Sequence, residues 1–150
     1  MDIYQRILKD HETLRALMDK AEKGKGDLRA VYDELQRELW AHAKVEETVF
    51  YAALAGSKEA RSEAKEGVNE HHLINTLADE LNSLEPGGEN WKAKVQVLGE
   101  LLRHHLDEEE EELFEEAREV LDDKRAKALG ATFDERKKHA LAALAPLEAH

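Results

Sequence analysis

Apolar residues recur every three or four positions along almost the whole chain, which is the spacing of one buried face of an α-helix. Proline is absent until Pro86, and no segment of useful length reads as a strand. Turn residues divide the pattern into four long helices, which we expect at about 2–23, 27–55, 57–84 and 90–121. Because the three connections are short, neighbouring helices should be antiparallel. The sequence therefore predicts an all-α, up-down-up-down four-helix bundle.

The expected boundaries rest on capping and turn residues. Asp2, Asp27 and Ser57 are suitable N-caps, and the Gly-rich turns at 24–26 and 85–88 end the first and third helices. Beyond a bundle at about 2–122, Gly130 precedes the capping box Thr132 to Glu135, which predicts a short fifth helix at about 132–145. We expect residues 1–150 to form a single domain.

Ionisable residues interrupt the centre of each apolar face. Each predicted helix contributes one inward histidine, and the second and fourth add a glutamate four residues later: His11, His42, Glu46, His71, His105 and Glu109. Each histidine lies about 12 to 15 residues from its turn, which at about 1.5 Å of rise per residue is roughly 20 Å. In an antiparallel bundle the four histidines then meet on one level. Burying ionisable groups is costly unless they are paired or coordinated, so the convergence of these six side chains needs a physical reason.

The spacing within the motif indicates a metal site. The segments His42-x-x-x-Glu46 and His105-x-x-x-Glu109 share their offsets to later aromatic residues, and Asp10-His11 is repeated as Glu70-His71. A histidine and a glutamate four residues apart share a helix face, so both can reach the same centre. Two glutamates can bridge two ions that each take two histidines. This nitrogen and oxygen set suits iron or manganese, with zinc possible.

Composition narrows the alternatives. The chain contains no cysteine, which excludes thiol catalysis, disulfides and thiolate metal sites. A net charge of −12 opposes binding to nucleic acid and favours cations. No apolar run is long enough for a membrane span, and the first residues lack a secretory pattern, so we expect a cytoplasmic protein that does not contact a membrane.

Over roughly residues 3–121 the pattern H, H-x-x-x-E, H, H-x-x-x-E resembles the hemerythrin-like family of HHE cation-binding bundles. The resemblance implies a non-haem di-iron site, with manganese or zinc less expected. It places the metal ligands at His11, His42, Glu46, His71, His105 and Glu109, with the two glutamates in the bridging role.

The third helix departs from the oxygen-carrying members that the sequence resembles. Those members place a fifth histidine one turn from the third-helix ligand, where this chain has Gly67 and Asn75. A reversible oxygen carrier is therefore not expected. The vacancy could hold water, peroxide or a seventh protein ligand from Glu63, Glu66 or Glu70. Gly67 could provide space beside the metal or allow close helix packing.

The remaining histidines and aromatic residues are assigned other roles. His72 and His104 project off the apolar faces, although His72 could exchange roles with His71, and His139 and His150 lie beyond the bundle. The aromatic residues are expected to pack in the core or at its edge, although a tyrosine near the metals could donate to a bound oxygen ligand: Tyr4, Tyr32, Trp40, Tyr51 and Trp91.

Two functions fit these features. One is a di-iron protein that binds or reacts with dioxygen, nitric oxide or peroxide, with a possible peroxide-consuming or nitric-oxide-consuming activity. The other is an iron-responsive regulatory or binding module without turnover. A metal-free interaction bundle would have to bury six polar groups together without a cation.

Overall fold

The computed structural model describes residues 1–148, and within these residues every regular element is helical. The α-helices are α1 (Ile3–Lys23), α2 (Leu28–Val45), α3 (Lys58–Leu81), α4 (Glu89–Glu108), α5 (Phe114–Val120) and α6 (Asp123–Glu148). Two π-helical segments, η1 (Glu46–Tyr51) and η2 (Glu109–Leu113), directly follow α2 and α4. The second predicted helix is thus α2 with η1, and the fourth is α4, η2 and α5 in succession.

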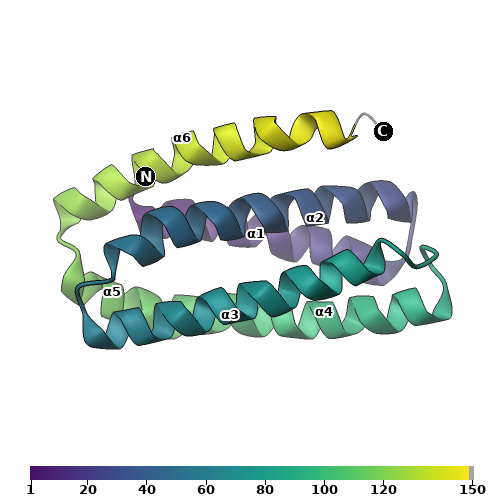
Figure 1. Cartoon of the computed structure of the whole chain (residues 1–150), viewed down its shortest axis with the longest axis horizontal. Helices are drawn as coiled ribbons and strands as arrows, with labels where there is room; N and C mark the ends of the chain where they lie inside the picture. The colour runs from purple at the N-terminus through teal and green to yellow at the C-terminus, as the bar shows by residue number, and fades with distance from the viewer. Residues whose placement is uncertain (149–150) are drawn as a thin grey trace.

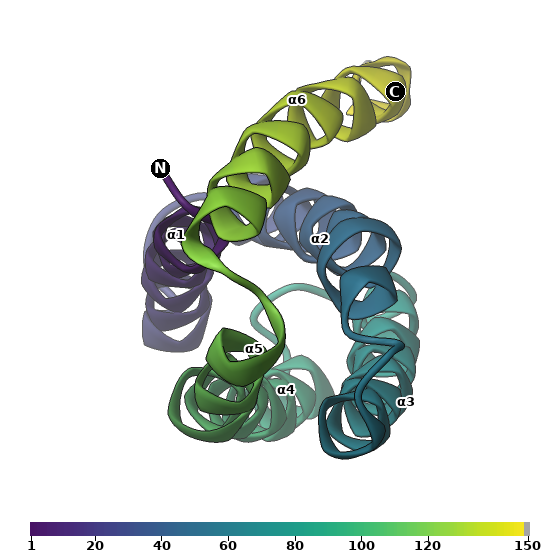
Figure 2. The same ribbon diagram turned by 90° about the vertical axis from the view of Figure 1, so that its left-hand side faces the viewer.

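These helices form the predicted four-helix bundle. Figure 1 shows α1 to α4 lying lengthwise beside one another, and Figure 2, an end-on view, shows them around a common axis with α5 continuing α4. The sixth helix, α6, lies outside this ring and packs along α1 and α2. The fold class is confirmed. None of the helices in the described part of the chain combines the length and the apolar character that a bilayer crossing demands.

The expected caps form the helix ends. The side chains of Asp2, Asp27 and Ser57 accept hydrogen bonds from backbone N–H groups three residues later, and Asp2 completes a capping box with Gln5. Gly24 ends α1 in the left-handed conformation at φ 66°, which glycine adopts without strain. The four helices of the bundle therefore begin close to the positions predicted from the sequence.

The fifth predicted helix, at about 132–145, is longer than expected. It corresponds to α6, which begins at Asp123 because the Asp122 carboxylate caps its first turn by accepting a hydrogen bond from the backbone of Arg125. Thr132 lies inside this helix and donates to the carbonyl of Ala128, so it is not an N-cap. Gly130 lies within α6, and a Cβ there would lie 2.3 Å from the carbonyl oxygen of Met1, so the glycine permits close contact between α6 and the start of α1.

The apolar core consists of two separate clusters along the bundle axis. On α1, Ile3, Tyr4 and Ile7 belong to one cluster, and Leu14, Leu17 and Met18 belong to the other. His11 lies between them. The predicted polar level is therefore a layer between two apolar clusters.

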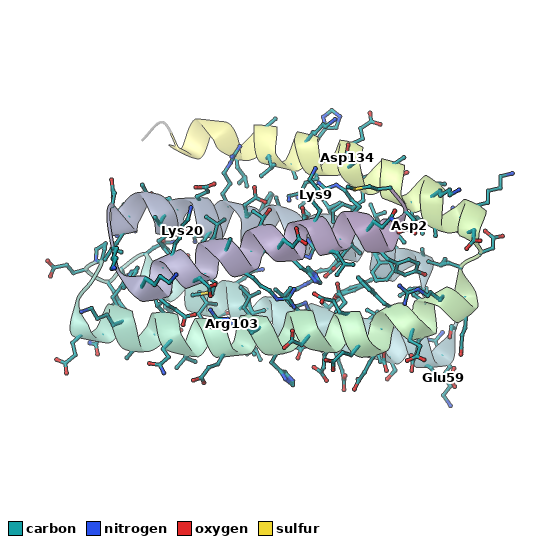
Figure 3. The ribbon with its side chains drawn as sticks, turned by 180° about the vertical axis from the view of Figure 1, so that it is seen from behind. Asp2, Lys9, Lys20, Glu59, Arg103 and Asp134 are labelled. Atoms are coloured by element: carbon teal, nitrogen blue, oxygen red, sulfur yellow. The ribbon has the colours of Figure 1, made fainter. Side chains whose placement is uncertain are left out.

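On the surface, Arg103 of α4 contacts Asp19 and Glu22 of α1, each at 2.6 Å, and Figure 3 shows it near the edge of α1.

Candidate metal centre

The six residues indicated by the sequence converge in the middle of the bundle, and all are buried. They form two overlapping groups whose possible ligand atoms lie within 4.8 Å of one another: His11, His42, Glu46 and Glu109 in the first, and Glu46, His71 and His105 in the second. We call these the His11/His42 position and the His71/His105 position. The structure brings all six predicted residues together.

Glu46 lies between the two positions. Its Oε2 atom is 3.1 Å from Nε2 of His42, and its Oε1 atom is 3.1 Å from Nε2 of His71 and 4.0 Å from Nε2 of His105. One carboxylate oxygen therefore faces His42 of the first position, and the other faces both histidines of the second. This is the placement of a carboxylate that bridges two ions.

Glu109 has the same relation to the two positions from the opposite side of the bundle. Its Oε1 atom lies 3.3 Å from Nε2 of His11, and its Oε2 atom lies 4.0 Å from Nε2 of His105. The two glutamates are the first residues of η1 and η2, so equivalent positions on two parallel helices, α2–η1 and α4–η2, place them at the centre. A π-turn inside an α-helix is uncommon and frequently occurs at functional sites.

The outer nitrogen of every site histidine is held by a carboxylate from another helix. The Nδ1 atoms donate from His11 to Glu110 (2.6 Å), from His42 to Asp10 (2.8 Å), from His71 to Glu47 (2.8 Å) and from His105 to Glu70 (2.7 Å). An ionised carboxylate only accepts, so these bonds place the hydrogen on Nδ1 and direct the Nε2 lone pair inward. This arrangement is typical of histidines that bind metal ions.

The sequence did not identify these four carboxylates as hydrogen-bond partners of the histidines, although it contains a signal for this role. Each one is adjacent in the chain to a predicted ligand, in the pairs Asp10-His11, Glu46-Glu47, Glu70-His71 and Glu109-Glu110. Neighbouring residues on a helix point about 100° apart, so the neighbour of one ligand can reach the histidine of the next helix. Glu70, one candidate for a seventh ligand, is thus the partner of His105.

The inward atoms fit a pair of cations. The Nε2 atoms of His11 and His42, both oxygens of Glu46 and Oε1 of Glu109 are buried without a hydrogen bond. Several lie close together, yet they are not aligned as donor and acceptor, as expected of atoms that point at a shared position. Nε2 of His71 lies 3.0 Å from Nε2 of His105. Two nitrogens bound at right angles to one ion at about 2.1 Å would be about 3.0 Å apart.

The charges around the centre also favour bound cations. Burial raises the pKa of Glu109, and the facing Glu46 carboxylate raises it further. Burial alone would lower the pKa values of His42 and His71, but the neighbouring carboxylates raise both to about 9. Without a cation, protons on these imidazoles balance the carboxylates. A metal ion would replace those protons.

Tyr51 is a component of the site that the sequence assigned mainly to packing. Its hydroxyl donates to Oε2 of Glu109 at 2.8 Å, and its ring stacks on His71 at 5.7 Å between centroids. Burial and the nearby Glu109 raise the pKa of Tyr51 well above its ordinary value, so the hydroxyl keeps its proton. A Cβ on Gly67 would lie 2.4 Å from this hydroxyl. The space beside Gly67 therefore accommodates Tyr51, which reaches the site across it.

A polar pocket leads from the surface to the His71/His105 position. His105, Glu109 and Tyr51 line its inner end, and Glu63, Glu66, Glu70, Glu108 and Glu112 line its outer part. Glu63 faces Glu116, and burial together with this second carboxyl raises the pKa of Glu63 to about 7. The His11/His42 position is covered instead by aromatic rings, from Phe114 beside His11 and Phe133 beside His42.

The other histidines lie outside the centre. His72 and His139 are exposed, and His104 is exposed and pairs with Glu108 at 3.0 Å. His71 is buried and faces the site, so the structure favours the expected register of the third helix over the exchange with His72. His150 lies outside the described residues.

Fold and site together define a helical bundle with a buried histidine and carboxylate centre able to bind metal ions. Residues 2–117 match the hemerythrin HHE cation binding domain family, and the chain belongs to that family. The fold is similar to the crystal structure of a hemerythrin HHE cation binding domain-containing protein from Mycobacterium kansasii, with a TM-score of 0.83 at 20% identity over 95% of this chain and 89% of that one.

A second comparison concerns a much longer protein. Over 116 residues the chain is 23% identical to a protein described as a DNA nickase from Nostoc sp. (strain PCC 7120 / SAG 25.82 / UTEX 2576). The match covers 76% of this chain but only 33% of the relative.

Proposed function

We propose that this chain is a non-haem di-iron protein that binds or reacts with a small ligand such as dioxygen, nitric oxide or peroxide. The observation that supports it best is the placement of Glu46 and Glu109, each of which turns one oxygen toward a histidine of the His11/His42 position and the other toward a histidine of the His71/His105 position. Two imidazoles and shared carboxylates per ion form a nitrogen and oxygen set that suits iron. The proposed ligands are the six residues His11, His42, Glu46, His71, His105 and Glu109.

Bound iron would supply the redox chemistry and the open coordination positions. The protein's own residues would control access and proton supply. The pocket beside Glu70 and Glu108 gives a small molecule a route to the His71/His105 position. Tyr51 stands at its inner end with a protonated hydroxyl, which can donate to an oxygen-containing ligand held there.

The proposal favours reaction over reversible carriage. Oxygen carriers that resemble this family place a fifth histidine one turn from the third-helix ligand, where this chain has Gly67 and Asn75, and Tyr51 occupies the space beside Gly67. The site therefore has a hydrogen-bond donor beside one of the two positions that could have held a further ligand. A proton donor next to a bound oxygen molecule assists its reduction.

An iron-responsive regulatory module is the second candidate. Its supporting observation is that the matched domain makes up only part of the longer relative, so such domains occur joined to other functional parts. The nickase activity itself is not proposed for this chain, because a net charge of −12 repels a phosphate backbone.

Metal analysis combined with absorption spectroscopy tests the assignment. Purified protein should hold two iron ions per chain and absorb in the near ultraviolet when oxidised. Reduced protein mixed with oxygenated buffer in a stopped-flow instrument should become diferric and stay so after oxygen is removed under vacuum. Zinc without this absorption would overturn the iron assignment. A colour that disappears under vacuum, with return to reduced iron, would establish reversible carriage instead.

A further inference from the structure

Lys137 of α6 is a buried cation that reaches toward the metal centre from outside the four-helix bundle. It is only 3% exposed, and its Nζ atom lies 2.9 Å from Oδ2 of Asp10 on α1 and 2.9 Å from Oε2 of Glu38 on α2. Burying an ammonium group is costly unless it is paired and hydrogen-bonded. Two carboxylates from two helices meet that requirement.

Asp10 connects this lysine to a proposed ligand. The same Oδ2 atom that accepts from Lys137 also accepts from Nδ1 of His42 at 2.8 Å. The other oxygen, Oδ1, accepts from Arg6 at 2.7 Å, and Arg6 in turn donates to Asp134 of α6 at 2.9 Å. Both oxygens of Asp10 are thus tied to α6, one directly and one through Arg6. Figure 3 shows Asp134 on α6 beside α1.

Apolar contacts place the same face of α6 against the centre. Phe133 is fully buried one turn before Lys137, and its ring centroid lies 5.9 Å from that of His42. The guanidinium of Arg6 lies over this ring, 5.2 Å from its centroid. Gly130, a further turn back, allows the close approach to the start of α1. His42 is therefore held by α6 through its ring and through its Nδ1 partner.

The other three site histidines are held within the bundle. Their Nδ1 partners belong to α3, η1 and η2: Glu70, Glu47 and Glu110. These carboxylates are partly exposed, whereas Asp10 is buried beneath α6. The His11/His42 position thus depends on a helix that lies beyond residues 2–117, the part that matches the family.

We propose that Lys137 is a positioning residue for the His11/His42 position, so that docking of α6 and metal binding at this position strengthen each other. Lys137 fixes the Asp10 carboxylate, and Asp10 fixes the orientation and tautomer of His42. Removing such an outer partner typically weakens metal binding 10-fold to 100-fold, and Lys137 acts one step further out, so we expect about tenfold. The inference rests on the metal binding proposed above.

The first test compares Lys137→Met with Lys127→Met, an exposed lysine on the same helix. Each protein is titrated anaerobically with ferrous iron, and site occupancy is measured by metal analysis and anomalous scattering. Lys137→Met should bind iron about tenfold more weakly at the His11/His42 position and normally at the His71/His105 position. Wild type and Lys127→Met should fill both. Equal affinities at both positions in all three proteins would overturn the inference.

The second test needs no variant and covers the case in which Lys137→Met fails to fold. Coupling is reciprocal, so iron should slow hydrogen exchange at the backbone amides of residues 126–137 in the wild type by a similar factor of about ten. Exchange in α6 that does not change on iron binding would contradict the proposed coupling. A wild-type protein that takes up no iron would instead overturn the proposed function, and this inference with it.

Discussion

The hydroxyl of Tyr51 donates a hydrogen bond to Oε2 of Glu109 at 2.8 Å, joining η1 to η2 across the bundle. This bond places a proton donor next to a carboxylate that faces both metal positions. The same oxygen is the one turned toward His105. Tyr51 therefore stands where a ligand entering from the acidic pocket would meet the centre.

Replacing Tyr51 with Phe should keep both metal ions but slow the reaction with peroxide. A positioned proton donor typically contributes about 100-fold or more to a rate, so we expect a loss of at least about tenfold. Tyr4→Phe is the matched control, because the Tyr4 hydroxyl is buried in the apolar cluster without a hydrogen-bond partner. Stopped-flow rates and metal content would be measured together. Equal rates in the two variants would remove Tyr51 from the reaction.

Gly67→Ala should disturb the site even though alanine favours helices by about 1 kcal/mol over glycine. The added Cβ would lie 2.4 Å from the Tyr51 hydroxyl and 2.8 Å from its ring, and the stacked ring has little room to move. We expect a lower melting temperature and slower peroxide consumption.

Gly99→Ala provides the control for this glycine. Its Cβ would meet the ends of the flexible side chains of Glu22 and Arg103, which can shift at the surface. That variant should therefore be as stable as wild type or more so. A Gly67→Ala protein that is equally stable and active would show that Tyr51 can move without cost.

Paired substitutions distinguish ligands from their neighbours in the chain. His71→Ala and His105→Ala should each reduce iron content sharply, because their Nε2 atoms face the centre. His72→Ala and His104→Ala should keep two ions per chain, since both side chains are exposed. Iron content and the gain in melting temperature on metal addition would be measured for all four. Loss of iron in His72→Ala but not in His71→Ala would reverse the assignment on α3.

Metal binding should become tighter as pH rises from about 6.5 to 9. The pKa values of His42 and His71 are raised from 6.5 to about 9 in the metal-free protein, and a metal ion must displace both protons. The raised values stabilise the metal-free fold fully below pH 6.5, and this contribution is lost as pH rises toward 9. The gain in melting temperature on metal addition should therefore increase across this window.

Calorimetry in buffers of different ionisation enthalpy measures the same effect directly. At pH 7 we expect release of at least about two protons for each chain that fills both positions, one from His42 and one from His71. Affinity that stays constant between pH 7 and 8.5 would contradict the protonated state of these histidines in the metal-free protein.

The bundle and its six central residues could be predicted because helix geometry converts spacing into height. His11, His42, His71 and His105 lie at similar distances from their turns, and the short turns force antiparallel neighbours. The assignment of these six residues as metal ligands stays a prediction, as does the single domain of residues 1–150. What the structure adds is the direction of each side chain, in particular the Nδ1 contacts.

The π-helical segments could not be predicted from the pattern. A π-turn contains one extra residue relative to an α-turn, and a run of glutamates such as Glu109 to Glu112 is equally compatible with either. Tyr51 is the last residue of η1, and it is buried together with Val49 and Phe50. Its contact with the centre is not evident from an α-helical pattern, which assigns it mainly to packing.

Because the core is divided into two apolar clusters, the metal-free bundle should be least stable in the polar layer between them. Helical bundles ordinarily fray from their ends, where backbone groups lack partners. Here the central layer holds facing carboxylates whose charge is balanced only by protons on the imidazoles, while apolar side chains pack on either side of it. Without metal, amide exchange should therefore be fastest for buried residues near His11 and His71, and slower near Ile7 and Leu81. Amide exchange that becomes faster only toward the helix ends would show that the imidazole protons alone are enough to stabilise this central layer.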